Sequence, residues 1–135
     1  MTAELLDIDT SGPGLYEFTN HLIPLAKGDG VMTVFVRHTS CSLLVQENAD
    51  PSVQRDLHNF LKRLVPHSDD PQMDWVTHRS EGPDDMPAHI KAAMLPVSLS
   101  IPVISGRLAL GTWQGVYLFE HRDRPHRRSV AVVCS

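Results

Sequence analysis

The chain has 135 residues, of which 41% are hydrophobic and 21% are charged, and its formal net charge is −4. This length and composition predict one globular domain over residues 1–135 and exclude a disordered or fibrous chain. The negative charge argues against a nucleic-acid partner, and no hydrophobic run approaches the ~20 residues of a membrane span. The first residues lack the features of a secretory signal, and two cysteines cannot build a disulfide framework. We therefore expect a reduced, cytoplasmic protein.

The first half of the chain predicts strands followed by one long helix. Residues 31–38 are rich in β-branched side chains and contain no breaker, which is typical of a strand; residues 15–22 give a weaker strand pattern. Residues 50–65 predict the helix, because Asp50 is a natural N-cap and Pro51 suits the first helical position. Its hydrophobic residues recur every three or four positions and predict one buried stripe: Val53, Leu57, Phe60, Leu61 and Leu64.

A long segment without periodicity, residues 65–83, separates this helix from a shorter one. Loops of this length in small domains are usually functional or disordered, and we expect this one to be ordered because it carries a tryptophan and two histidines. The shorter helix is expected over about residues 86–95, with Asp85 as its cap. Its predicted buried side consists of Met86, Ile90, Ala93 and Met94.

The last third of the chain is expected to form strands at 97–104, 107–112, 116–120 and 129–133. Ser105-Gly106 predicts a two-residue hairpin, and Gln114-Gly115 predicts a further tight turn. Successive strands with two main helices indicate the α+β class, with an antiparallel, sandwich-like sheet core and helices on one side.

Two polar clusters flank the predicted strand and helix. The run 38–42, His-Thr-Ser-Cys-Ser, offers an imidazole and hydroxyl donors at the end of a strand, although the local sequence favours a polar turn whose side chains bond their own backbone. Pairing of Cys41 with His38 as nucleophile and base is disfavoured, because positions so close in one chain rarely orient correctly. The helix dipole explains Asp50 but leaves Glu47 and Asn48, which precede the helix, without a structural role.

The run 78–91 holds two histidines, several carboxylates and a lysine near the start of the shorter helix. Imidazole and carboxylate ligands suit zinc or a similar divalent ion, and a catalytic zinc keeps one position open. No His-x-x-x-His spacing places two histidines on one helix face, so folding must assemble any metal site. A purely structural role for each histidine is the alternative interpretation.

A fourth cluster surrounds Trp113. Between glycines in a turn, Trp113 could stack on a planar ligand with Gln114 at its polar edge, or could close the end of the core. The basic stretch 122–128 either forms a solvated loop or attracts an anionic substrate by its positive charge. Phosphate-loop, dinucleotide-binding, serine-elbow and Cys-x-x-Cys motifs are absent from the sequence.

Taken together, the runs 38–40, 46–51, 78–91, 111–115 and 120–122 resemble the YjbQ-like family, whose members are often labelled secondary thiamine-phosphate synthase enzymes. The resemblance implies an α+β fold with a β-sandwich core and a homotrimeric assembly. It also implies weak thiamine-phosphate synthase activity, which joins a hydroxymethylpyrimidine pyrophosphate to a thiazole phosphate and releases pyrophosphate. Two departures from the family pattern are Gln46, where asparagine is usual, and Pro96, where glycine is frequent.

The resemblance further implies a divalent metal, zinc or magnesium, bound near His38, His78 and His89, with His121 as a reserve ligand. On this hypothesis Glu47, Lys91 and Asp84 are catalytic residues, with Glu47 as the base and Lys91 stabilising the departing pyrophosphate. The expected substrate-binding residues are Thr39, Ser40, Asn48, Trp113 and Gln114. A non-catalytic trimer that binds a metal or an anionic metabolite is the alternative, and metal-dependent phosphate-ester hydrolysis is a third possibility.

Overall fold

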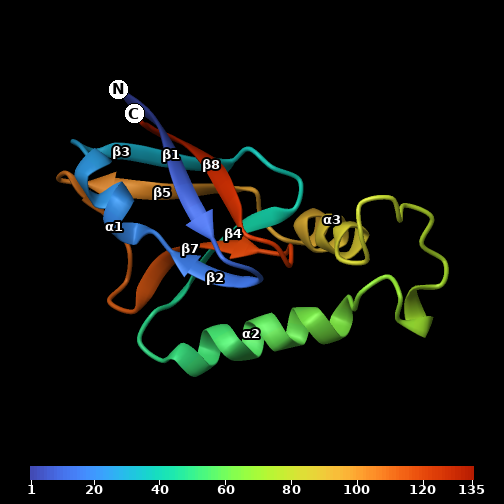
Figure 1. Ribbon diagram of the computed structural model, residues 1–135. Coiled ribbons are helices and arrows are strands. Elements are labelled where there is room, and N and C mark those ends of the chain that lie inside the picture. The colour runs from blue at the N-terminus through green and yellow to red at the C-terminus, as the bar shows by residue number, and fades with distance from the viewer.

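Two antiparallel sheets face each other in the computed structural model, which describes residues 1–135 (Figure 1). The larger sheet has the strand order β1-β8-β3-β5-β6 and the smaller β2-β7-β4. The strands of the larger sheet are β1 (Thr2–Thr10), β3 (Gly30–Val36), β5 (Ser98–Ile104), β6 (Arg107–Leu108) and β8 (His126–Cys134). Those of the smaller sheet are β2 (Gly14–Glu17), β4 (Cys41–Glu47) and β7 (Gln114–Glu120). The α+β sandwich expected from the sequence is therefore confirmed.

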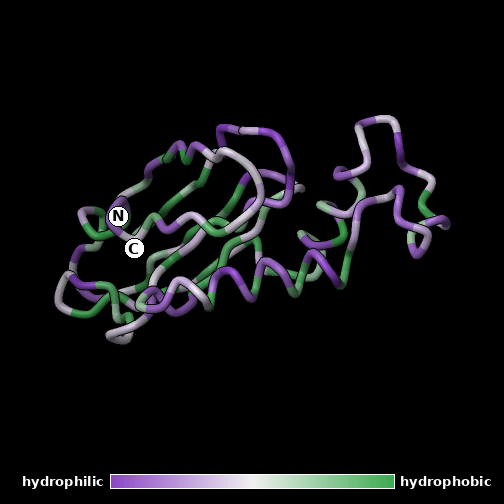
Figure 2. The backbone as a smooth tube through the Cα atoms, turned by 60° about the horizontal axis from the view of Figure 1, so that its bottom comes forward, coloured by the Kyte–Doolittle hydropathy of each residue, from purple (hydrophilic) through white to green (hydrophobic).

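The main core fills the space between the sheets. Met32, Val34 and Val36, the inward residues of β3, are almost fully buried, as their alternation predicts. They pack with inward residues of the other strands, among them Val116 and Leu118 of β7. In Figure 2 the hydrophobic segments gather in the strands, while much of the segment that projects beyond them is hydrophilic.

Helix α2 (Pro51–Leu64) covers the outer face of the smaller sheet (Figure 1). Asp50 caps it as predicted, since its carboxylate accepts a hydrogen bond from the Ser52 N–H at 2.9 Å. The predicted stripe is only partly correct: Leu61 is buried, but Phe60 and Leu64 are exposed. The helix reaches past the edge of the sandwich, so its last turn has no sheet beneath it.

Helix α3 (Asp85–Met94) buries a different side from the one predicted. Asp85, Pro87, Ala88, Lys91 and Ala92 are its buried residues, whereas Met94 is exposed. Asp85 is the first helical residue rather than the cap, a position held by Asp84. Two charged residues, Asp85 and Lys91, thus lie inward on α3.

Several shorter elements complete the chain. The segment before β3 contains the short helix α1 (Thr19–Leu22) and the 3₁₀ turn η1 (Ile23–Leu25) rather than an extension of the strand predicted at 15–22. The hairpin at Ser105-Gly106 is confirmed, because both residues have positive φ and Ile104 pairs with Arg107. Gln114-Gly115 is not a turn, since both residues pair with β4 at the start of β7.

The long segment between α2 and α3 includes the 3₁₀ turn η2 (Pro71–Met73) and is ordered by its own small core. Met73 and Val76 pack with Val65 and with the partly buried Met86 of α3. The Arg79 guanidinium donates hydrogen bonds to three backbone carbonyls of this segment. These contacts hold His78, which follows Val76 closely, against the start of α3. No helix of the protein is both long and apolar enough to span a membrane.

Candidate metal centre

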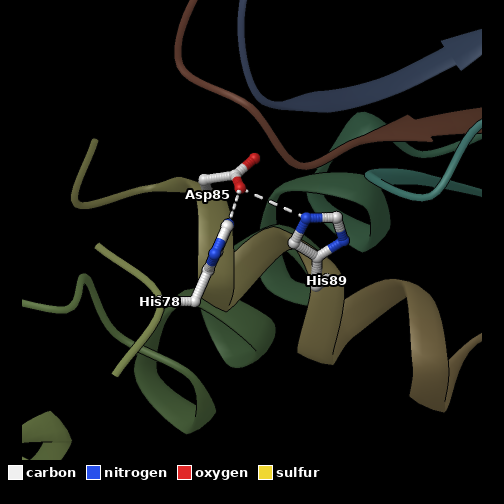
Figure 3. A group of neighbouring side chains, drawn as sticks. All are labelled: His78, Asp85 and His89. Atoms are coloured by element: carbon white, nitrogen blue, oxygen red, sulfur yellow. Dashed lines mark hydrogen bonds and ion pairs between the residues drawn. The ribbon is translucent and has the colours of Figure 1, made fainter. Parts of the chain in front are cut away.

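Three potential metal ligands meet at the N-terminal end of α3: His78, Asp85 and His89 (Figure 3). Asp85 and His89 are one helical turn apart and share a face of α3, while His78 comes from the long segment. Their ligand atoms all lie within 4.8 Å of one another. Folding therefore assembles two imidazoles and one carboxylate into a set that suits a divalent cation.

The two oxygens of the buried Asp85 carboxylate have different partners. Oδ2 lies 2.7 Å from His78 Nε2 and 3.2 Å from His89 Nε2. Oδ1 forms an ion pair with Arg122, whose Nη1 is 2.8 Å away. The same guanidinium donates through Nε to Asp84 at 2.8 Å. Arg122 thereby fixes the orientation of Asp85 and leaves its second oxygen toward the histidines.

A contact with the backbone determines which ring nitrogen of His89 carries the proton and which can bind a metal ion. His89 Nδ1 lies 3.0 Å from the Thr39 carbonyl oxygen, which can only accept, so Nδ1 carries a proton. In a neutral ring, Nε2 then presents its lone pair to Asp85 Oδ2. Two acceptors at 3.2 Å repel each other unless a cation or a proton lies between them. A carbonyl that orients a histidine in this way is typical of metal sites.

The neighbouring charges favour the protonated form of His78 and the ionised form of Asp85. The hydrogen bond to Asp85 raises the pKa of His78 above its usual value, with a further contribution from the Glu81 carboxylate. Burial alone would raise the pKa of Asp85, but the hydrogen bond from His78 and the charge of Arg122 outweigh burial and lower it. Asp85 is consequently an anion that attracts one positive charge to this point.

His38 does not join this group, so the structure corrects the expected set of three histidines. Its Nε2 accepts a hydrogen bond from the Ser129 N–H at 2.8 Å, and that contact ties the ring to β8. Burial lowers the pKa of His38 and favours the neutral ring that this contact requires. His38 and His89 instead line a common cavity of about 380 Å³.

Thr39, which directly follows His38 in the chain, lines the same cavity. Its carbonyl oxygen positions His89, a role that the sequence analysis did not assign to it. Ser40, the next residue, is largely buried, and its carbonyl oxygen accepts a hydrogen bond from Arg128. The Thr39 backbone therefore lies beside the candidate metal centre, whereas the Ser40 backbone contacts the buried Arg128.

Two predicted catalytic residues, Asp84 and Lys91, lie close to the centre but on another side of α3. The Asp84 carboxylate accepts hydrogen bonds from Arg122 Nε and the Asp123 N–H, and it lines a second cavity with Lys91. His121, the reserve ligand, also lines that cavity and bonds to Ser42 rather than to the histidines at the metal centre. Cys41 is a poor nucleophile, since burial raises the pKa of its thiol to about 12.

The remaining predicted residues lie at the far end of β4. Glu47 pairs with Gln114, and the Asn48 N–H donates to the Trp113 carbonyl. Glu47 also accepts a hydrogen bond from the Asp50 N–H at the start of α2. Strand β4 begins at Cys41, close to Thr39, and rises about 3.3 Å per residue. Glu47, the last residue of β4, therefore lies on the order of 20 Å from Cys41. Within one chain, Glu47, Asn48, Trp113 and Gln114 do not share a site with His89.

Two residues of the candidate centre were not predicted from the sequence: Asp85 as a potential ligand and Arg122 as the residue that positions it. The sequence did contain a signal for Asp85: the spacing Asp-x-x-x-His places Asp85 and His89 on one helix face, just as the spacing His-x-x-x-His does for two histidines. Arg122 had no such signal, because it lies far from Asp85 along the chain and only the fold brings them together.

Comparison with known proteins identifies the family of this chain. The family model described as "UPF0047 protein YjbQ-like" matches residues 5–135. The chain belongs to the YjbQ family. A Synechocystis member, UPF0047 protein sll1880, is 50% identical over 133 residues, which cover 96% of this chain and 88% of that protein. The YjbQ protein of Escherichia coli O157:H7 is 43% identical over 107 residues, covering 78% of this chain and 74% of that protein.

Solved YjbQ-type structures share the fold along nearly the whole chain. The conserved hypothetical protein TT1486 of Thermus thermophilus superposes with a TM-score of 0.84 at 36% identity, covering 98% of this chain and 99% of that chain. A YjbQ/UPF0047 protein of Clostridium acetobutylicum, described as uncharacterized, gives a TM-score of 0.84 at 33% identity and covers 96% and 98% of the two chains. These relatives establish family and fold, and their descriptions name no reaction.

Proposed function

We propose that His78, Asp85 and His89 bind a divalent metal ion and that the protein is a metal-assisted enzyme acting on a small phosphorylated substrate. The observation that supports this most strongly is the Nε2 atom of His89, directed at Asp85 by the Thr39 carbonyl. Two imidazole nitrogens and a carboxylate oxygen form a ligand set that suits zinc better than magnesium, which prefers oxygen ligands. Three protein ligands also leave a coordination position open for substrate.

A bound metal of this kind would act as a Lewis acid toward a phosphoryl or pyrophosphate oxygen. The protein's own residues supply position and surroundings. Arg122 holds Asp85 from behind, and the cavity of about 380 Å³ provides space next to His89. Phe35 and Val97 give that cavity apolar walls suited to a flat heterocycle, while the His38 ring supplies a polar edge.

Within this class, we propose the reaction that the YjbQ resemblance implied: condensation of a hydroxymethylpyrimidine pyrophosphate with a thiazole phosphate. Pyrophosphate departure leaves negative charge that must be stabilised near the N-terminus of α3, where backbone N–H groups contribute. The proposal does not need Glu47 or Trp113, which lie at the other end of β4. Within a single chain, the proposed reaction therefore needs no general base from the far end of β4.

Metal analysis of purified variants tests the ligand set. His89→Ala and Asp85→Asn should each lose most of the bound zinc, measured by inductively coupled plasma mass spectrometry after dialysis. His38→Ala should keep it, because His38 Nε2 is engaged by Ser129. The exposed His21 provides the matched control, His21→Ala. Loss of metal in His38→Ala with retention in Asp85→Asn would contradict the proposal.

A second function remains a proposal for the same site: a non-catalytic protein that binds a metal or an anionic metabolite. It is favoured by the lack of a reactive nucleophile, since Cys41 is buried with a raised pKa. Steady-state turnover of the two thiamine precursors with added zinc separates the two proposals. Turnover far below about 1 s⁻¹, the low end of ordinary enzymes, together with tight ligand binding would favour the binding protein. Phosphate release from generic esters would instead favour hydrolysis.

We also propose a homotrimer, the assembly implied by the family resemblance. The outward face of the larger sheet carries an apolar row across three adjacent strands, in which Leu5 and Phe35 flank Ala131. The side chains of Leu5 and Phe35 are 63% and 45% exposed in the single chain. An exposed apolar face of this kind is expected to be covered by another copy. The two free cysteines, both buried, accord with the proposed cytoplasmic location.

A further inference from the structure

A second polar cavity lies between α2 and α3, on the side of α3 away from the metal centre. Its volume is about 330 Å³. Basic and imidazole side chains from three elements line it: Lys62 and His58 of α2, Lys91 of α3, and His121 at the end of β7. His78, Asp85 and His89 are not among its lining residues. The cavity is therefore a separate site.

Helical periodicity explains why α3 serves both sites. Asp85 and His89 are four residues apart and share the face toward His78. Asp84, Pro87 and Lys91 follow spacings of three and four and line the cavity. Arg122 connects the two sides through its contacts with both Asp84 and Asp85.

His121 carries an unsatisfied polar atom in this region. Only 3% of the residue is exposed, and its Nδ1 has no hydrogen-bond partner. Its Nε2 lies 2.9 Å from the Ser42 hydroxyl, which is itself fully buried and has no other partner. The arrangement that satisfies Ser42 is donation from its hydroxyl to Nε2. His121 Nδ1 then carries the ring proton and is a donor without an acceptor.

Lys91 adds a positive charge that no carboxylate neutralises by direct contact. The residue is 9% exposed and forms no ion pair. Four carboxylates also line the cavity. Three of them are engaged, Asp84 by Arg122 and the Asp123 N–H, Asp123 by His67 at 3.2 Å, and Asp70 by the Gln72 N–H, whereas Asp69 is exposed to solvent. Burial lowers the pKa of the His121 ring, and the charge of Lys91 lowers it further. A lysine that is largely buried near an unpartnered N–H costs free energy unless an acceptor of opposite charge joins them.

We propose that this cavity binds an oxyanion of the phosphate class, held by Lys91 and His121, with Lys62 at its rim. The ligand is either free phosphate or the phosphoryl group of a small metabolite, since both present the same oxygens. Charge-assisted hydrogen bonds from the ammonium and the imidazole N–H satisfy both donors. The proposal does not depend on the metal centre.

Calorimetric titration of inorganic phosphate into the full chain, in metal-free buffer of matched ionic strength, tests the proposal. Wild type should bind phosphate and show a raised Tm, while Lys91→Met should weaken binding at least about tenfold, as expected for loss of a charged hydrogen bond. Lys91→Met should itself remain folded, because a methionine removes a buried unpaired charge. Lys27→Met, a lysine outside the cavity, is the matched control and should bind as wild type does.

A second variant keeps the test independent of any folding defect. Lys62 is exposed, so Lys62→Met should fold normally and weaken phosphate binding a fewfold. Parallel titration with phenyl phosphate distinguishes the sources, and tighter binding of the monoester assigns the cavity to a metabolite. The proposal is overturned if wild type shows no phosphate binding beyond sodium chloride controls, or if Lys91→Met and Lys27→Met bind phosphate equally.

Discussion

His121 couples the stability of the fold to pH at the scale of a single side chain. Burial, helped by the positive charges of Lys91, Arg128 and His58 and opposed by Glu120, lowers its pKa to about 3. The folded protein therefore holds the neutral ring, whereas the unfolded chain protonates near pH 6.5. The contribution of the neutral His121 ring to the free energy of unfolding is fully present above pH 6.5 and is lost as the pH falls from there toward about 3.

Denaturation in urea at several pH values checks this expectation. In phosphate-free buffer, the free energy of unfolding should fall by about 1.4 kcal/mol per pH unit below about 6.5 from this residue alone. His121→Asn should have a shallower pH dependence, whatever its absolute stability. Equal slopes for wild type and variant would contradict the assignment.

Glu120 and Arg128 form a buried ion pair between the two sheets. Glu120 is fully buried on β7, and its carboxylate contacts the Arg128 guanidinium of β8 and the Thr10 hydroxyl of β1. Removing the carboxylate would leave a buried guanidinium without a counter-charge. Glu120→Ala should therefore destabilise the protein by about 3–5 kcal/mol in urea titration. The exposed Glu4→Ala should change stability by less than about 0.5 kcal/mol, and similar losses in both would contradict this account.

At the scale of whole elements, the sequence predicts best where local signals suffice. The alternation in β3 and the Asp50-Pro51 start of α2 depend on neighbours along the chain, and both are confirmed. Strand β1 was missed because its acidic residues interrupt the hydrophobic pattern; it is an edge strand whose pairing partner is β8, at the other end of the chain.

The buried face of α3 was predicted wrongly for a related reason. Hydrophobicity selects Met86, Ile90 and Met94; the first two are only partly buried and Met94 is exposed, whereas the fold buries Asp85 and Lys91. Burial of Asp85 is possible only because Arg122 arrives from the β7–β8 connection. The candidate site was accordingly half predictable: the types and region of its ligands followed from the run 78–91, while the choice of Asp85 over His38 depended on contacts between distant segments.

For the whole molecule, the outward face of the larger sheet predicts self-association. Leu5→Glu places a charge in the apolar row beside Ala131, outside the proposed substrate cavity, and should shift the proposed trimer toward monomer. Size-exclusion chromatography with light scattering measures the mass directly. Ile23→Glu, at an exposed position in η1, is the control and should leave the trimer intact. A monomeric wild type at micromolar concentration would contradict the proposed assembly.

The proposed metal centre requires two imidazoles and one carboxylate to converge on one metal ion at the start of α3. X-ray absorption at the zinc edge of the zinc-loaded protein counts these ligands directly. We expect two imidazole nitrogens at about 2.0–2.1 Å from the zinc, with oxygen atoms completing its coordination shell, and one imidazole after His78→Ala. Three imidazoles in the wild type, or no specifically bound zinc, would contradict it.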